Sequence, residues 1–274
     1  MEIVFVKLQG NGNDFILINE YLEQVIPEDL KADFATAYCD RRFGIGGDGV
    51  LFLSKSDVAD LRMRLFQPDR SEASMCGNGI RCLVRFAFDA GYVQNDCLVE
   101  TGAGIIPVTM GYGEDGFMAS VQMPNPAFEP SKIPASVPGR EYREEIEGFT
   151  VYAVNTGVPH AVIPVEDVAR VDLGRIGPIV RHHQTFPEGA NVNLVQHLGE
   201  SKIRIRTYER GVEAETLSCG TGATAAAAVA HRLGIVGPSV EVETPGGPLW
   251  IELGSVTRMK GPADTVFYGV LPIL

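Results

Sequence analysis

The chain contains two copies of one pattern, and this repeat constrains its fold more than any other feature. The pattern Cys-Gly-x-Gly occurs at Cys76 and again at Cys219, an offset of 143 residues. In the same register, Val-Glu-Thr at 99–101 matches Val-Glu-Thr at 242–244. Upstream matches at this offset are Glu72 with Glu215, Leu51 with Leu194, Gly46 with Gly189, and Phe43 with Phe186. A register kept from about residue 43 to about residue 101 indicates two homologous halves.

A proline-rich stretch separates the two halves. Residues 122–139 contain Pro124, Pro126, Pro130, Pro134 and Pro138, and proline blocks both helices and central strands. We therefore predict an N-terminal half of residues 1–120, completed by a C-terminal strand at 263–274. The C-terminal half then comprises residues 121–262.

Each half shows the same series of predicted elements: strands, a helix, more strands, and a second helix that begins at the cysteine. Runs typical of strands occupy residues 4–8, 15–18, 50–53 and 61–66 in the first half, and 161–164, 192–195 and 203–208 in the second. Residues 28–42 show helical spacing of apolar side chains.

The helix after each cysteine is apolar on nearly all sides. Residues 223–230 contain one polar side chain, and residues 80–90 leave a narrow polar stripe at Arg81, Arg85 and Asp89. Such helices are buried. We predict an α+β fold of two pseudo-symmetric halves, each a mixed β-sheet wrapped around a central helix, with a cleft between the halves where the two helix starts meet.

A cysteine at a helix start indicates acid–base chemistry. The first N–H groups of a helix have no partner within it, bind carboxylates, and favour a thiolate over a thiol. Glycine after each cysteine lets these N–H groups approach a ligand. A substrate carboxylate held there would allow one sulfur to remove an α-proton and the other to return one on the opposite face. Cys76 and Cys219 are therefore the predicted catalytic pair of a cofactor-independent amino-acid racemase or epimerase.

Composition excludes several other classes. The net charge of −12 argues against a nucleic-acid partner. An odd number of cysteines, five, with no C-x-x-C pair indicates reduced thiols and no zinc site. Neither a signal peptide nor an apolar run long enough to span a bilayer is visible. We expect a cytoplasmic protein with a small amino-acid substrate, no membrane partner, no metal and no cofactor.

One glycine-rich segment matches a dinucleotide-binding pattern by letter alone. Residues 44–49 read Gly-Ile-Gly-Gly-Asp-Gly. A nucleotide site needs a strand before this pattern and a helix after it. Charged residues precede it and a strand-like run follows, so we interpret it as a turn.

Several short motifs, found in the same order along the whole chain, resemble those of the diaminopimelate epimerase family. The segments that carry the resemblance are residues 12–15, 75–82, 159–160, 189–192, 208–211 and 219–222. The resemblance implies interconversion of LL- and meso-2,6-diaminopimelate for lysine or cell-wall precursor synthesis, without pyridoxal phosphate or metal. It also implies a homodimer.

The resemblance carries over to single positions. Cys76 and Cys219 match the catalytic pair. The positions that match residues binding the substrate's reacting carboxylate through the backbone are Gly77, Asn78, Gly220 and Thr221. The positions that match other substrate contacts are Asn13, Asn191, Glu209 and Arg210, with Gln67 and His160 as further candidates. The chain departs from the family at three positions: Gln67 stands where asparagine is usual, Val158 where asparagine is common, and Gly49 where glutamine is common.

Two alternatives remain open. A histidine or proline racemase could share this fold and both cysteines, although Glu209 and Arg210 favour a substrate with a second charged end. A non-catalytic binder, or an isomerase of the phenazine-biosynthesis type, is a different class. Relatives of that class lack one or both cysteines, which this chain retains.

Overall fold

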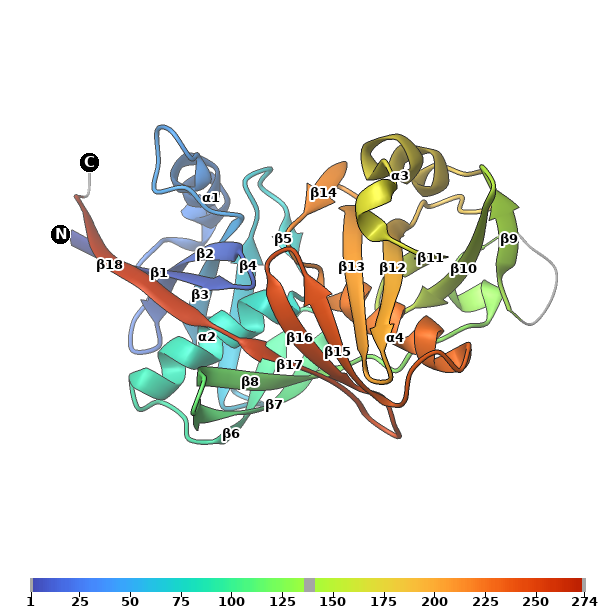
Figure 1. The fold of residues 1–274 in the computed structure, drawn as a ribbon. Coiled ribbons are helices and arrows are strands. Elements are labelled where there is room, and N and C mark those ends of the chain that lie inside the picture. Colours follow the sequence, from blue (N-terminus) through green and yellow to red (C-terminus); the bar gives the residue numbers. More distant parts are fainter. Residues whose placement is uncertain (1, 136–140, 273–274) are drawn as a thin grey trace. The chain divides into compact units, whose positions relative to one another are not determined.

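The computed structural model describes residues 2–135 and 141–272 (Figure 1). The chain forms two compact units. Unit 1 comprises Met1–Val121 and Lys260–Leu274, and unit 2 comprises Gln122–Met259. The C-terminal strand therefore belongs to the same unit as the N-terminal strand, and Figure 1 shows the two lying side by side.

Unit 1 is built on one mixed sheet. Its strands are β1 (Glu2–Gly10), β2 (Asn13–Glu20), β3 (Gly49–Ser54), β4 (Leu61–Phe66), β5 (Glu72–Ala73), β6 (Asp96–Thr101), β7 (Gly104–Gly113), β8 (Gly116–Met123) and β18 (Asp264–Pro272). The pairing order is β18-β1-β2-β3-β4-β6-β7-β8, with β5 also on β4. The β2–β3 and β4–β6 pairs are parallel and the others are antiparallel.

A buried helix lies inside this sheet. Helix α2 (Gly77–Asp89) contacts β1, β2, β3, β4, β7 and β18. The predicted helical segment at 28–42 forms a short 3-10 helix, Glu28–Leu30, followed by α1 (Lys31–Cys39). The glycine-rich residues 44–49 then turn directly into β3. The element directly before them is helix α1 and the element directly after them is strand β3, the reverse of the order that a nucleotide site needs, which agrees with their interpretation as a turn.

Unit 2 repeats the arrangement. Its strands are β9 (Arg143–Ile146), β10 (Phe149–Asn155), β11 (Pro159–Val165), β12 (Asn191–Gly199), β13 (Lys202–Glu209), β14 (Ala214–Thr216), β15 (Ser239–Thr244) and β16 (Gly247–Glu252), and β17 (Thr257–Pro262) leads back towards unit 1 in the chain. The order β9-β10-β11-β12-β13-β15-β16 again contains two parallel pairs, β11–β12 and β13–β15.

Helix α4 (Gly220–Arg232) is the counterpart of α2 and contacts β10, β11, β12, β13, β15 and β16. All its residues from 222 to 230 are buried, as the apolar sequence predicts. Helix α3 (Leu173–Arg181) and the 3-10 helices Pro130–Lys132 and Val168–Arg170 complete the unit. The predicted α+β fold of two similar halves, each wrapped around one helix, is confirmed.

The polar stripe of α2 contains a buried arginine. Arg81 belongs to this stripe, and its side chain is fully buried. Its guanidinium donates to the carbonyl of Pro262 and to the side-chain oxygens of Asn78 and Asn11. These acceptors compensate the loss of water. Within the described ranges, no helix is long and apolar enough to cross a membrane.

Candidate active site

Cys76 and Cys219 occupy the same local position in the two units. Each is the N-cap residue of its central helix, with extended backbone at φ −147° for Cys76 and φ −123° for Cys219. Each sulfur accepts the backbone N–H of the residue three positions on, Gly79 or Gly222, at 3.4 Å. The cysteines thus take the role that serine or threonine usually has at a helix start, where the helix dipole favours negative charge.

The glycines at these helix starts are required by close packing. A Cβ at Gly222 would lie 2.5 Å from Oδ1 of Asn193 and 3.3 Å from the sulfur of Cys219. A Cβ at Gly79 would lie 3.3 Å from Leu51 and 3.6 Å from the sulfur of Cys76. The second glycine of each Cys-Gly-x-Gly motif therefore brings backbone N–H groups up to the sulfur.

The remaining cysteines are in a different environment. All five thiols are free. Burial raises the pKa of Cys39 to about 11 and the pKa of Cys82 and Cys97 to about 12. These three thiols stay protonated at neutral pH and behave as small apolar side chains. Cys76 and Cys219 are distinguished by capping a helix.

Two predicted substrate contacts lie beside Cys76. Oδ1 of Asn13 is 3.8 Å from the sulfur, and Nδ2 of Asn78 donates to the same oxygen at 3.3 Å. Gly77 is the first buried residue of α2. Gln67, by contrast, is exposed in the turn after β4, where its oxygen accepts from Ser71 at 3.0 Å.

The backbone around Cys219 is also held in place. The hydroxyl of Thr221 lies 3.4 Å from the sulfur. The carbonyl of Thr221 accepts from the hydroxyl of Thr156 at 2.9 Å, and the carbonyl of Gly220 accepts from Thr224 at 2.9 Å. The bond from Thr156 ties the first turn of α4 to the residue that follows β10, and the bond from Thr224 lies within the helix.

His160 on β11 is a fully buried neutral imidazole. Burial lowers its pKa to about 3, with a further contribution from the charge of Arg210. Nδ2 of Asn193 lies 3.0 Å from its Nδ1. The other ring nitrogen, Nε2, has no hydrogen-bond partner within the described part of the chain.

Asn193 is a site residue that our sequence reasoning missed. It links His160 to the start of α4, since its Oδ1 approaches Gly222 and accepts from Thr207 at 3.0 Å. The signal was present: Asn193 is two residues after Asn191 on β12, and side chains two apart on a strand share a face. Sequence reasoning also missed Asp48, whose carboxylate accepts from the side chain of Asn13 at 2.5 Å.

Asn191, Glu209 and Arg210 come together where β12 begins and β13 ends. Oδ1 of Asn191 accepts the backbone N–H of Arg210 at 2.8 Å, and its Nδ2 donates to the carbonyl of Pro159 at 3.3 Å. The Arg210 guanidinium donates to the carbonyl of Glu188 at 3.1 Å. Glu209 accepts from the hydroxyl of Thr216 at 2.5 Å.

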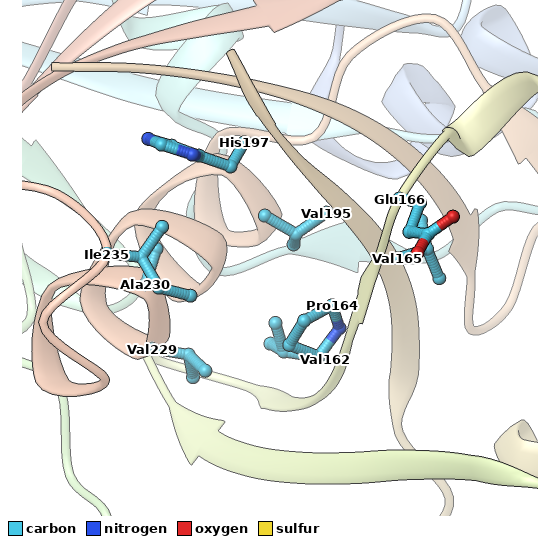
Figure 2. Close-up of a pocket in the computed structure, with 9 residues that line it drawn as sticks. All are labelled: Val162, Pro164, Val165, Glu166, Val195, His197, Val229, Ala230 and Ile235. Atoms are coloured by element: carbon cyan, nitrogen blue, oxygen red, sulfur yellow. The ribbon is translucent and has the colours of Figure 1, made fainter. Parts of the chain in front are cut away.

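An open pocket of about 400 Å³ in unit 2 contains none of these residues (Figure 2). It is lined by Val162, Pro164, Val165, Glu166, Val195, His197, Val229, Ala230 and Ile235. Val229 and Ala230 belong to the last turns of α4, whereas Cys219 lies at its first. This pocket therefore lies near the end of α4 opposite to Cys219. No group of three or more potential metal ligands gathers in the ranges that the structure describes.

Comparison with known proteins agrees with the motifs. The family model described as diaminopimelate epimerase matches residues 5–127 and 152–266. Diaminopimelate epimerase of Methanothrix thermoacetophila is 57% identical, covering 98% of this chain and 96% of that protein. The enzyme of the same name from Archaeoglobus fulgidus is 46% identical, covering 99% and 97%.

Solved structures share the fold at low identity. A phenazine biosynthesis protein of the PhzF family from Bacillus anthracis superposes with a TM-score of 0.72 at 17% identity, covering both chains completely. A hydroxyproline epimerase from Agrobacterium vitis superposes with a TM-score of 0.68 at 16% identity, covering 98% of this chain and 92% of that one. These likenesses concern the fold alone. The family match and the close relatives over nearly the whole length show that this chain is an isomerase and belongs to the diaminopimelate epimerase family.

Proposed function

We propose that the protein interconverts LL- and meso-2,6-diaminopimelate by proton transfer at the α-carbon, in lysine biosynthesis, with Cys76 and Cys219 as acid and base. One observation carries the proposal. Two cysteines of the chain cap two separate buried helices in matching geometry, each sulfur accepting an N–H three residues on. The identity of the proposed substrate is inferred from the family and from close relatives of the chain.

The reaction balances with these two groups alone. A thiolate takes the α-proton and becomes a thiol, while the opposite thiol gives its proton to the other face of the carbon and becomes a thiolate. The configuration inverts, and the reverse reaction exchanges the two roles. Since each thiol can serve as acid or base, the scheme calls for neither pyridoxal phosphate nor a metal.

The helix starts supply the stabilisation that this step needs. Removing the α-proton places negative charge on the substrate carboxylate. Backbone N–H groups at Gly77 and Asn78, and at Gly220 and Thr221, lie at positive helix ends and suit that charge. We propose that both helix starts share one substrate carboxylate, with the α-carbon between the two sulfurs.

The distal end of the substrate carries its own carboxylate and ammonium, which we assign to Arg210 and Glu209. The hydrogen bonds from Arg210 to backbone carbonyls use Nη1. A guanidinium has five N–H donors, so capacity remains for a carboxylate. Asn13 and Asn191 offer both donors and acceptors to the amino-acid centres. His160 remains a further candidate contact. We place the reaction in the cytoplasm, a reducing compartment in which both catalytic thiols would stay reduced.

The test is deuterium wash-in. The enzyme is incubated in heavy water with LL-diaminopimelate and, separately, with histidine, proline, lysine and glutamate, and deuterium at the α-carbon is followed by mass spectrometry. We expect rapid exchange with diaminopimelate and background exchange with the others. Faster exchange into histidine or proline would favour the alternative racemase and remove the diaminopimelate assignment.

A further inference from the structure

Two side-chain amides beside Cys76 form part of a hydrogen-bond chain with one direction. Arg81 donates from Nη1 to Oδ1 of Asn78 at 2.9 Å. Asn78 donates from Nδ2 to Oδ1 of Asn13 at 3.3 Å, and Asn13 donates from Nδ2 to Oδ2 of Asp48 at 2.5 Å. The chain therefore begins at a guanidinium, passes through two amides, and ends at a carboxylate. We call it the amide relay.

Neither end of the amide relay can reverse its role. Arg81 has only donors and is fully buried. Both carboxylate oxygens of the exposed Asp48 have donors: Oδ1 accepts from Arg41 at 2.8 Å and Oδ2 accepts the backbone N–H of Asp14 at 3.1 Å. In all of these contacts, including the one with Asn13, the carboxylate of Asp48 is the acceptor.

The fixed ends determine how each amide is oriented. An asparagine amide can otherwise rotate so that its oxygen and nitrogen exchange places. Rotating Asn13 alone would place its NH2 group against that of Asn78 and its oxygen against the carboxylate of Asp48. Both contacts are repulsive, and the half-buried amide of Asn13 would lose its hydrogen bonds to Asn78 and Asp48. The oxygen of Asn13 therefore faces the sulfur of Cys76.

Asp48 reaches this position because of the glycine-rich turn. The backbone N–H of Asp48 donates to the carbonyl of Asp14 at 2.8 Å. A Cβ at Gly47 would lie 3.1 Å from the ammonium of the buried Lys7 and 3.3 Å from the carbonyl of Asp14. The turn that resembles a nucleotide-binding loop by letter thus brings a carboxylate to Asn13.

We propose that Asp48 and Arg81 are positioning residues, which lock the amides of Asn13 and Asn78 so that an acceptor oxygen faces Cys76. This inference rests on the proposed function, in which Cys76 exchanges the α-proton and Asn13 contacts the substrate. An oxygen beside the sulfur stabilises the S–H form and can accept from a substrate ammonium. An N–H in its place would stabilise the thiolate and repel the ammonium.

The variant Asp48→Asn tests the relay with little change in shape. Its side chain can donate to Asn13 and so permits the reversed amide. We expect kcat/KM for epimerisation to fall about ten- to hundredfold, with a raised KM, because a hydrogen bond to a charged group is lost. Alkylation of the Cys76 peptide by iodoacetamide, followed by mass spectrometry, should reach half its maximal rate about one pH unit lower than in the wild type.

Asp40→Asn is the matched control. Asp40 accepts the backbone N–H groups of Arg42 and Phe43 at 2.7 Å in the loop that leads to the same turn, and is not part of the relay. We expect wild-type kcat/KM and a wild-type alkylation profile from this variant, even where the melting temperature falls. A folded Asp48→Asn protein with both readouts unchanged would overturn the proposal.

The orientation can also be read in the wild-type protein, should Asp48→Asn fail to fold. In protein labelled with 15N-asparagine, the side-chain NH2 protons of Asn13 should show nuclear Overhauser contacts to the amide proton of Asp14. Contacts to the β-protons of Cys76 instead would overturn the relay. Neither alkylation nor this measurement uses diaminopimelate, so failure of the substrate assignment and failure of the relay give different results.

Discussion

The side-chain amide of Asn193 donates to Nδ1 of His160 across 3.0 Å, and this contact determines the tautomer of the imidazole. The same NH2 group donates to the carbonyl of Ala161 at 3.1 Å, while the oxygen of Asn193 accepts from Thr207. Since Nδ1 accepts, a neutral ring carries its proton on Nε2. His160 is therefore a fixed N–H donor at neutral pH.

The buried neutral His160 makes stability depend on pH. Burial and the charge of Arg210 lower its pKa to about 3 in the folded state, whereas an unfolded histidine titrates near pH 6.5. Between these values the unfolded chain binds the extra proton, so the free energy of unfolding decreases as the pH falls. The contribution is at most about 1.4 kcal/mol per pH unit.

His160→Gln should remove this contribution. Urea unfolding at a series of pH values from about 7 down to about 4 would give the slope for both proteins. We expect the variant to be less stable at pH 7 and to lose less stability than the wild type on acidification. Equal slopes would mean that His160 takes up a proton in the folded state as readily as in the unfolded state.

The two helix-capping thiols should be indispensable. Cys76→Ala and Cys219→Ala each remove one acid–base group, and we expect turnover to fall at least about a thousandfold with the fold intact by circular dichroism. Cys82→Ala is the control, because burial holds that thiol protonated with a pKa of about 12. Its activity should persist with a small loss of stability. Normal epimerisation by Cys76→Ala would reject the two-thiol scheme.

The pocket in unit 2 corresponds to a filled position in unit 1. Ile235 matches Tyr92 at the repeat offset of 143 residues. Tyr92 stacks on Tyr21 with ring centroids 4.0 Å apart, and its hydroxyl accepts from Asn19 at 2.9 Å. The equivalent region of unit 2 is the open pocket beside Ile235 (Figure 2).

Ile235→Tyr should therefore stabilise the protein. A ring in the pocket buries apolar surface without displacing a packed side chain, and we expect a gain of about 1 kcal/mol, visible as a higher melting temperature. Leu233→Tyr, at a position 39% exposed and not part of the pocket, should leave the melting temperature nearly unchanged. A lower melting temperature for Ile235→Tyr would show that the pocket cannot accept the ring.

An exposed apolar row on β1 and β18 is the surface on which we propose that the homodimer forms. Val266, Tyr268 and Val270 alternate along β18 and are 52–64% exposed, and Val4 is the cross-strand partner of Val270. A second copy of the chain would remove this surface from water. Val270→Asp should shift the sedimentation coefficient towards a monomer. Val58→Asp, at another exposed valine, should not. An unchanged mass for Val270→Asp would place the interface elsewhere.

Local patterns allowed much of the fold to be predicted from sequence. The run at residues 61–66 coincides with β4, and the cysteine motifs mark the starts of α2 and α4. These features follow from alternation, helical spacing and capping, which operate over a few residues. Because the two halves repeat at an offset of 143 residues, an element predicted in one half could also be predicted at the matching position of the other half.

Contacts between distant segments could not be predicted in this way. The amide relay joins Asn13, Asp48 and Asn78 from three separate parts of the chain. Its direction depends on which atom of each amide faces its neighbour, and composition and spacing carry no information on that. The partners of Arg81 could not be predicted for the same reason, because its acceptor at Pro262 is 181 residues away.

The pairing of β18 with β1 has a consequence for biosynthesis. Strand β1 precedes unit 2 along the chain, and its partner β18 follows unit 2. Unit 2 is continuous from Gln122 to Met259 and can gather its strands during translation. One side of β1 therefore stays unpaired until β18 has been synthesised, after the whole of unit 2. Nascent chains that stall late in translation would thus expose this unpaired strand edge, and chaperones that recognise such edges would find their target in the half that was synthesised first.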